Sequence, residues 1–135
     1  MIKLHGVLTK GNISFCIDSL RLEVHDGMSY AAVEGWAVSK DPEATLSTKV
    51  DGDEKKAVLS FVERQDVIDG MGVSSDPKKA GFIVQIPYER ESKNTPVIEL
   101  FFSSPGKEPV CFLRDFFPKG PMEMTGDDDI YLALD

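Results

Sequence analysis

The chain has 135 residues, of which 41% are hydrophobic, so it is long enough to form one domain around an apolar core. It carries 15 basic and 23 acidic side chains, for a formal net charge of −8. This charge repels phosphate backbones and anionic lipid headgroups, which disfavours nucleic-acid binding and membrane-surface binding. No apolar run reaches the roughly 18 residues that span a bilayer, and the first residues lack the apolar centre of a signal peptide. We therefore expect a cytoplasmic domain without direct membrane insertion; a membrane-associated parent protein stays open.

Hydrophobic residues alternate with polar ones through most of the chain, which is the pattern of strands with one buried face. The alternation begins at Ile13 and changes phase at Ser19, which predicts a β-bulge or a kink in one long strand. Asp26-Gly27 is a hairpin turn signal, and the next strand is expected over about 29–38. Further strands are expected over 46–50, 57–62, 82–88, 97–102 and 110–113.

One segment departs from this alternation. Val67, Ile68 and Met71 recur at helical spacing, with glycines at 70 and 72, which predicts a short helix near residues 64–71. About eight short strands separated by Gly/Pro turns indicate an all-β fold, an antiparallel β-sandwich that is jelly-roll-like. We expect the sandwich over 1–114, and a linker or tail over 115–135 that leads toward a further domain.

The cysteines and histidines give no strong signal of a chemical site. Cys16 and Cys111 lie in apolar, strand-like runs and are interpreted as reduced core thiols, with one buried disulfide as the alternative. His5 and His25 have no cysteine or carboxylate at zinc-ligand spacing, so surface positions are favoured.

Two acidic clusters resemble metal sites without the rest of the motif. Asp127-Asp128-Asp129 matches the Asp-x-Asp that holds a divalent metal and a sugar-nucleotide diphosphate in many glycosyltransferases, but no βαβ unit precedes it, so a solvated linker is favoured. Asp51, Asp53 and Glu54 resemble the start of a calcium loop, but Lys55 and Lys56 follow where ligands are needed, so a hairpin turn is favoured. The sequence therefore assigns no catalytic residue, no metal and no cofactor.

Four residues remain as weak binding candidates. Trp36 has an indole face that could stack on a sugar ring, although a core position is favoured, and Tyr88 is interpreted in the same way. Arg64 and Asp66 could bind an anionic ligand together. An ion pair, or a cap for the adjacent helix, is the favoured alternative for these two residues.

An ordered set of short motifs carries a family resemblance: EGWAVS at 34–39, VDG at 50–52, RQDV at 64–67 and AGF at 80–82. The set resembles an accessory β-sandwich domain of bacterial multidomain glycosyltransferases, often those of Gram-positive surface-polysaccharide synthesis. That domain usually has a GWA strand, a DG hairpin, an R-x-D-V segment on a short helical turn and a GF strand start. The resemblance covers roughly residues 13–114. It departs from the family at Gln65, where the family usually has proline, and it covers neither 1–11 nor 115–135.

The resemblance implies a non-catalytic domain beside a nucleotide-sugar transferase domain. Its partners would be its own catalytic domain and a glycan, and its role would be to position the acceptor glycan or to pack on the catalytic domain. The family's catalytic residues lie in another domain, so none is transferred to this chain. The alternative is a free-standing carbohydrate- or protein-binding β-sandwich, which an exposed aromatic strip including Trp36 would favour and a buried Trp36 would weaken. An enzyme in its own right is a third hypothesis, which needs a pocket with perturbed carboxylates.

Overall fold

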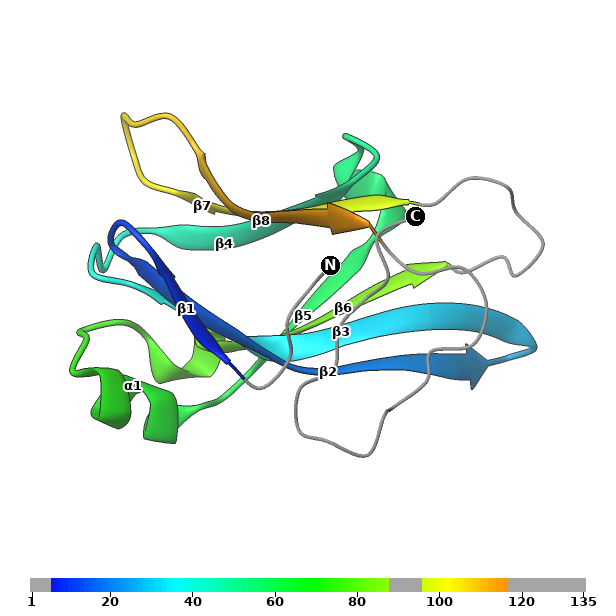
Figure 1. Ribbon diagram of the computed structural model, residues 1–135, viewed down its shortest axis with the longest axis horizontal. Coiled ribbons are helices and arrows are strands. Elements are labelled where there is room, and N and C mark those ends of the chain that lie inside the picture. The colour runs from blue at the N-terminus through cyan, green and yellow to red at the C-terminus, as the bar shows by residue number, and fades with distance from the viewer. Residues whose placement is uncertain (1–5, 88–95, 117–135) are drawn as a thin grey trace.

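The structure is a computed structural model, which describes residues 6–87 and 96–116. Two antiparallel sheets of this part pack face to face (Figure 1), with strand orders β1-β2-β3-β6-β5 and β4-β7-β8. The strands are β1 (Val7–Lys10), β2 (Ile13–His25), β3 (Met28–Ser39), β4 (Thr45–Val50), β5 (Val58–Val62), β6 (Gly81–Pro87), β7 (Val97–Ser103) and β8 (Val110–Phe116). The helices are α1 (Gln65–Met71) and the 3-10 turns η1 (Glu54–Lys56) and η2 (Pro77–Lys79). The prediction of an all-β antiparallel sandwich with one short α-helix is confirmed.

The β2–β3 hairpin forms the centre of the five-stranded sheet. Asp26 and Gly27 have φ angles of +52° and +78°, as a type I′ turn requires. The β2–β3 register shifts between Ile17 and Ser19, which is the bulge predicted at Ser19. Because the bulge adds one residue, Ile17 before it and Leu20 after it both join the core between the sheets.

The turn at Asp51-Gly52 forms as expected, but the hairpin predicted around it is wrong. Asp51 and Gly52 have φ angles of +52° and +78°, and Val50 and Asp53 are bridged across the turn. Beyond the turn the chain crosses to the other sheet, since β4 pairs with β7 and β5 pairs with β6. Turn chemistry fixes only the local reversal. The choice of partner strand depends on which faces are buried, and that is decided by residues about 50 positions away.

Two apolar clusters hold the sandwich together. The larger cluster lies between the sheets and is built from alternate residues of both: Ile13, Phe15, Ile17, Leu20, Ala31, Val33, Ala37, Leu46, Val50, Phe82, Val84, Ile86, Ile98, Leu100, Phe102 and Phe112. The smaller cluster lies on the outer face of the five-stranded sheet and comprises Cys16, Trp36, Val38, Val67, Ile68 and Ala80. Each fully buried large side chain contributes about 1.5–3 kcal/mol by its removal from water.

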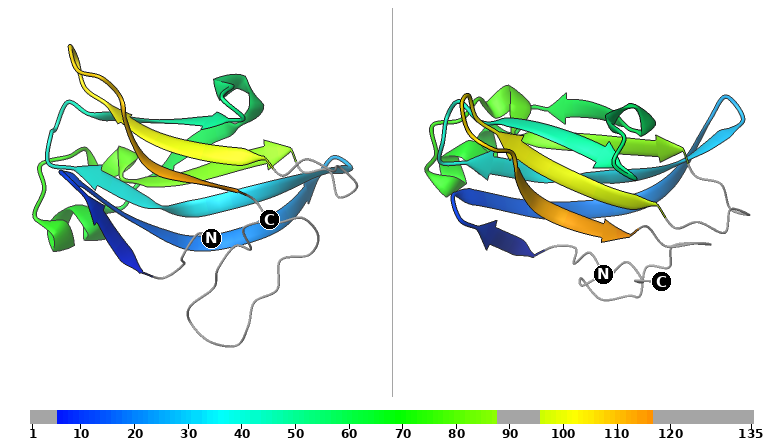
Figure 2. Two further views of the ribbon diagram at one scale, coloured as in Figure 1. Left: turned by 45° about the horizontal axis from the view of Figure 1, so that its top comes forward. Right: turned by 90° about the horizontal axis from the view of Figure 1, so that it is seen from above.

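Helix α1 covers one end of the outer face of the five-stranded sheet (Figures 1 and 2). Val67 and Ile68 are its buried residues, and they complete the smaller cluster. The helix ends at Gly72, which has a φ of +64° and donates its backbone N–H to the carbonyl of Ile68 at 3.1 Å. Seven residues are too few for a stable isolated helix, so α1 depends on this packing.

Several expectations fall at the limits of the described residues. β1 is a strand that the hydrophobic pattern did not predict, and β8 continues to Phe116, two residues past the expected domain boundary. His5, Tyr88, Asp127-Asp128-Asp129 and almost all of the expected tail lie outside the described residues, as does the side chain of His25. Within residues 6–87 and 96–116, no helix is long and apolar enough to cross a bilayer.

Candidate functional site

Trp36 is a core residue of the outer cluster. Only 7% of its surface is exposed, and it lies among Val38, Val67 and Ile68, under α1. The core interpretation of Trp36 is therefore confirmed, and the indole face is not available to stack on a sugar.

The glycine before Trp36 is required by a close approach of two strands. A Cβ built on Gly35 would lie 2.1 Å from the carbonyl oxygen of Cys16 and 3.1 Å from the Cα of Ile17. Both contacts come from β2 at the bulge, where it passes Gly35 of β3. The Gly-Trp pair of the first motif thus has a packing role at both positions.

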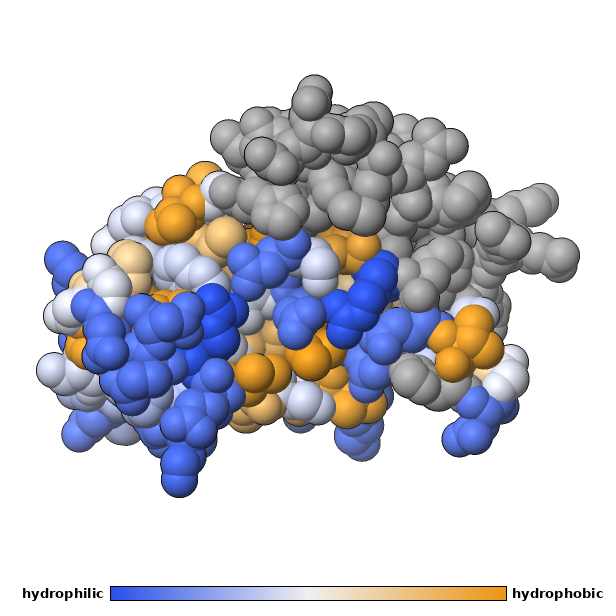
Figure 3. All heavy atoms as spheres, turned by 90° about the horizontal axis from the view of Figure 1, so that it is seen from below, coloured by the Kyte–Doolittle hydropathy of each residue, from blue (hydrophilic) through white to orange (hydrophobic). Residues whose placement is uncertain are grey.

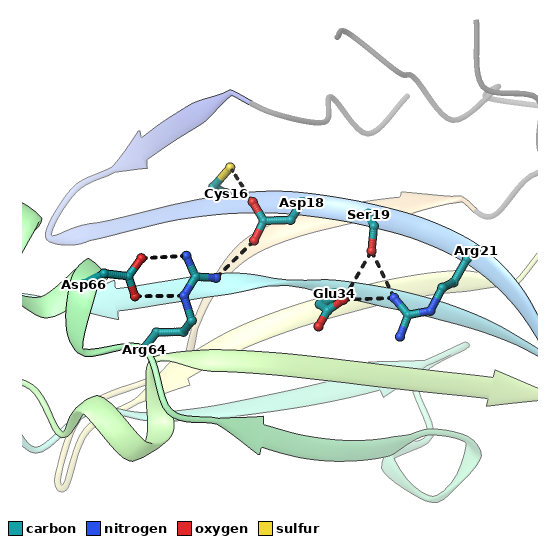
Figure 4. A network of polar contacts seen from close by, with 7 residues as sticks. All are labelled: Cys16, Asp18, Ser19, Arg21, Glu34, Arg64 and Asp66. Atoms are coloured by element: carbon teal, nitrogen blue, oxygen red, sulfur yellow. Dashed lines mark hydrogen bonds and ion pairs between the residues drawn. The ribbon is translucent and has the colours of Figure 1, made fainter. Parts of the chain in front are cut away.

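Arg64, which lies just before α1, connects α1 to β2 through its guanidinium group (Figure 4). Its Nε and Nη2 donate to the two oxygens of Asp66, each at 3.0 Å, and its Nη1 donates to Oδ2 of Asp18 at 3.3 Å. Gly81 makes room for this arrangement, since a Cβ there would lie 2.7 Å from the Cγ of Arg64. The ion pair expected between Arg64 and Asp66 is confirmed, and it extends to β2 through Asp18. Arg64 is the N-cap residue of α1, but its side chain makes no capping hydrogen bond, so it acts through the ion pair.

The electrostatic environment of Arg64 and Asp66 favours the charged form of each side chain. Hydrogen bonding by Arg64 holds the pKa of Asp66 below its ordinary value, and hydrogen bonding to Asp66 raises the pKa of Arg64 further. Asp18 also accepts a hydrogen bond from the thiol of Cys16 at 3.5 Å. Three of the five guanidinium N–H donors are thus engaged by carboxylates, which leaves Arg64 poorly suited to binding a second anion.

A second polar group on the same sheet was not predicted. Arg21 donates from Nη1 to Glu34 and to the hydroxyl of Ser19, each at 3.0 Å (Figure 4). These residues lie on neighbouring strands, and the bulge directs Ser19 and Arg21 onto the outer face together. A sequence pattern that includes the bulge predicts that these side chains share a face, but it does not predict their pairing.

The outer face of the five-stranded sheet is mixed in character. In Figure 3 the hydrophilic residues are densest on the left, over α1, and hydrophobic residues are interspersed along the middle. The part of this face that is in view offers no single large apolar patch of the kind that marks an obligate interface.

The aspartates of the turn after β4 accept hydrogen bonds from backbone N–H groups. Asp53 accepts a hydrogen bond from the N–H of Lys55 at 2.9 Å and caps η1. Asp51 accepts one from the N–H of Val97 at 3.0 Å, which ties the end of β4 to the start of β7. Among the residues that the structure describes, no three His, Cys, Asp or Glu side chains gather as a metal site.

The two cysteines are free, so the disulfide alternative is excluded. Cys16 is buried, and this burial raises its pKa to about 11, with a further contribution from Asp18. Cys111 is half-buried, and burial also raises its pKa.

One pocket of about 340 Å³ opens at the end of the sandwich, between the edge strands β4 and β5. It is lined by the end of β3, by β4, β5 and β7, and by the loops beside them: Ala37, Val38, Ser39, Pro42, Ala44, Thr45, Leu46, Phe61, Ser75, Asp76, Lys79, Ala80 and Phe102. Sequence reasoning missed this pocket, because its walls come from four strands and two loops that are distant in the sequence.

The pocket combines an aromatic ring with a few polar groups. Phe61 is 41% exposed. The hydroxyl of Ser75 donates to the carbonyl of Ser39 at 3.0 Å, and Asp76 accepts from the N–H of Lys78 at 3.0 Å. Lys79 and Asp76 are both exposed, so the lining offers an ammonium group and a carboxylate to a ligand.

No family model matches this chain, and no curated protein and no solved structure matches it.

Proposed function

We propose that this β-sandwich is a non-catalytic accessory domain of a bacterial glycosyltransferase, and that it packs on the catalytic domain of its parent protein. The family resemblance suggests that the domain lies beside a catalytic domain. The structural roles of the motif residues support the architectural function. Gly35, Trp36, Arg64 and Gly81 all act within the domain, in close approach, core packing or ion pairing. A set of motif residues with such roles identifies a scaffold, and it supports an architectural role over a sugar-binding platform at Trp36.

In this proposal the domain is cytoplasmic and is joined to a transferase that acts at the membrane. The net charge of −8 supports a protein partner over a nucleic acid or an anionic lipid surface. The glycan acceptor would then contact the catalytic domain, with the accessory domain setting the position of that catalytic domain.

The test compares the isolated 135-residue chain with the native polypeptide that contains it, purified through an antibody to this domain. We expect the native polypeptide to be larger than 14.9 kDa and to consume a nucleotide sugar, and the isolated chain to have no such activity. A native polypeptide of 14.9 kDa with no stably bound transferase would contradict the proposal, and so would nucleotide-sugar turnover by the isolated chain.

The pocket favours a second candidate function, a free-standing module that binds a carbohydrate. Its volume of about 340 Å³ is within the range for small-ligand sites, and Phe61 offers a ring beside Asp76 and Lys79. An NMR titration with bacterial surface oligosaccharides tests this function. Shifts confined to the backbone amides around Phe61 and Lys79, lost in Lys79→Ala and kept in the matched control Lys49→Ala, would support it. No shift with any oligosaccharide would exclude it for that panel.

A further inference from the structure

Strand β5 is the least protected of the edge strands. It lies at the outer edge of the five-stranded sheet, where β6 is its one partner among the described strands (Figure 2, right). An edge strand has a row of unpaired N–H and C=O groups, and proteins normally protect it with a charge, a proline, a bulge or a short length.

The other three edges of the described sheets each carry such a feature. β1 has four residues and ends in Lys10. β4 presents Lys49 among exposed threonine and serine side chains. β8 has a register shift opposite Leu100 and carries Arg114.

By contrast, the sequence of β5 is VLSFV, with no charged residue, no proline and no bulge. Two of its apolar side chains are exposed, Val58 at 57% and Phe61 at 41%. An uncharged edge strand with exposed apolar side chains is suited to accept another strand.

The sequence of β5 has the same order of apolar and polar residues in both directions, with Ser60 at its centre. Antiparallel pairing of two copies about Ser60 places Val58 opposite Val62 of the second copy and Leu59 opposite Phe61. Each apolar residue then has an apolar residue across the pair, and the two serines face each other at the twofold axis. Such cross-strand pairs stabilise a sheet, and a self-complementary patch is what a twofold-symmetric dimer needs.

Charges at the two ends of β5 are complementary in the same arrangement. Before the strand, η1 carries one glutamate and two lysines: Lys55 is exposed, and Lys56 is about half exposed and lies 3.8 Å from Asp51. After the strand, Glu63 is exposed. Antiparallel pairing brings Lys55 of one copy toward Glu63 of the other, twice by symmetry, whereas Lys56 already has its charge matched by Asp51, and Arg64 by Asp18 and Asp66.

We propose that two copies of this chain associate through antiparallel β5–β5 pairing centred on Ser60, which joins their five-stranded sheets into one. The proposal is independent of the accessory role proposed above. The pairing strand has only five residues, so we expect a weak dimer that assembles and dissociates with protein concentration.

Analytical ultracentrifugation of the full 135-residue chain, at concentrations up to about 1 mM, tests the proposal. The wild type should shift from 14.9 kDa toward twice that mass as its concentration rises. Ser60→Lys should abolish the shift, because two lysines would face each other at the axis. The matched control Ser47→Lys makes the same change at an exposed position of another edge strand, β4, and should dimerise as the wild type does.

A charge-swap mixture separates a lost interface from a lost fold. Ser60→Lys and Ser60→Glu should each be monomeric alone and should form a mixed dimer when combined, since opposite charges then meet at the axis. A wild-type dimer that Ser60→Lys leaves intact would overturn the proposal. A wild type that stays monomeric up to about 1 mM would also overturn it, and would leave the edge to an extended segment of another protein.

Discussion

Replacing Gly35 with alanine should destabilise the domain strongly. The new Cβ would lie 2.1 Å from the carbonyl oxygen of Cys16, whereas ordinary carbon–oxygen contacts are at about 3.3 Å or more. The strands would therefore have to separate by about 1 Å at the bulge, which strains their hydrogen bonds. Overpacking of this kind costs about 1–3 kcal/mol, and one or two weakened backbone hydrogen bonds add about 1 kcal/mol each. We expect a loss of about 2–5 kcal/mol and a melting temperature lowered by about 8–20 °C.

The assay is thermal and urea unfolding followed by circular dichroism, with Gly70→Ala as the matched control. Gly70 lies in α1 with a negative φ, and a Cβ there would contact nothing within 4 Å, so alanine should stabilise the protein by about 0.5 kcal/mol. The two variants thus make the same chemical change with opposite expected signs. If Gly35→Ala proved as stable as the wild type, the close approach at the bulge would not be a constraint on the fold, and the reasoning from this geometry would fail.

Three further predictions concern Trp36, the carboxyl groups and the thiols. Trp36→Ala should lose about 3–5 kcal/mol of unfolding free energy in urea, and Trp36→Phe much less; a loss under 1 kcal/mol for alanine would contradict the core position. The hydrogen bond from Ser104 lowers the pKa of Asp41, so this carboxyl stabilises the fold above its unfolded pKa of about 3.9, and that contribution is lost as the pH falls through the folded pKa. Ser104→Ala should therefore raise the pKa of Asp41 in an NMR titration, and an unchanged pKa would refute the assignment. Native protein treated with iodoacetamide at pH 8 should be modified first at Cys111, and at Cys16 only on unfolding, because burial raises the pKa of Cys16 to about 11; equal rates by mass spectrometry would argue against its burial.

Local signals in the sequence predicted the local features of the fold. The phase change at Ser19 and the turn signal at Asp26-Gly27 each depend on a few adjacent residues, and both features formed as expected. The helix beside Arg64 was predicted in the same way, from apolar residues one turn apart. The fold class was also predictable, because hydrophobic and polar residues alternate through almost every strand.

What the sequence did not predict depends on residues far apart in the chain. Val50-Asp51-Gly52 formed a turn, but the sheet that β5 joined was decided by pairing with β6, not by the turn. The bond between Arg64 and Asp18 joins residues 46 positions apart, and the walls of the pocket are equally scattered. Burial of Trp36 was favoured from the sequence, but the family motif alone did not distinguish a core anchor from a sugar platform.

The order of strands in the smaller sheet has a consequence during synthesis. β7 is the central strand of that sheet, so β4 has no partner in it until residues 97–103 have been made. Ile98 and Leu100 of β7 are fully buried against the inner face of the larger sheet. A nascent chain that has emerged only as far as β6 therefore exposes that apolar face to solvent. Such exposure is where chaperones act and where aggregation begins, so the sandwich closes late in translation, once β7 and β8 have left the ribosome.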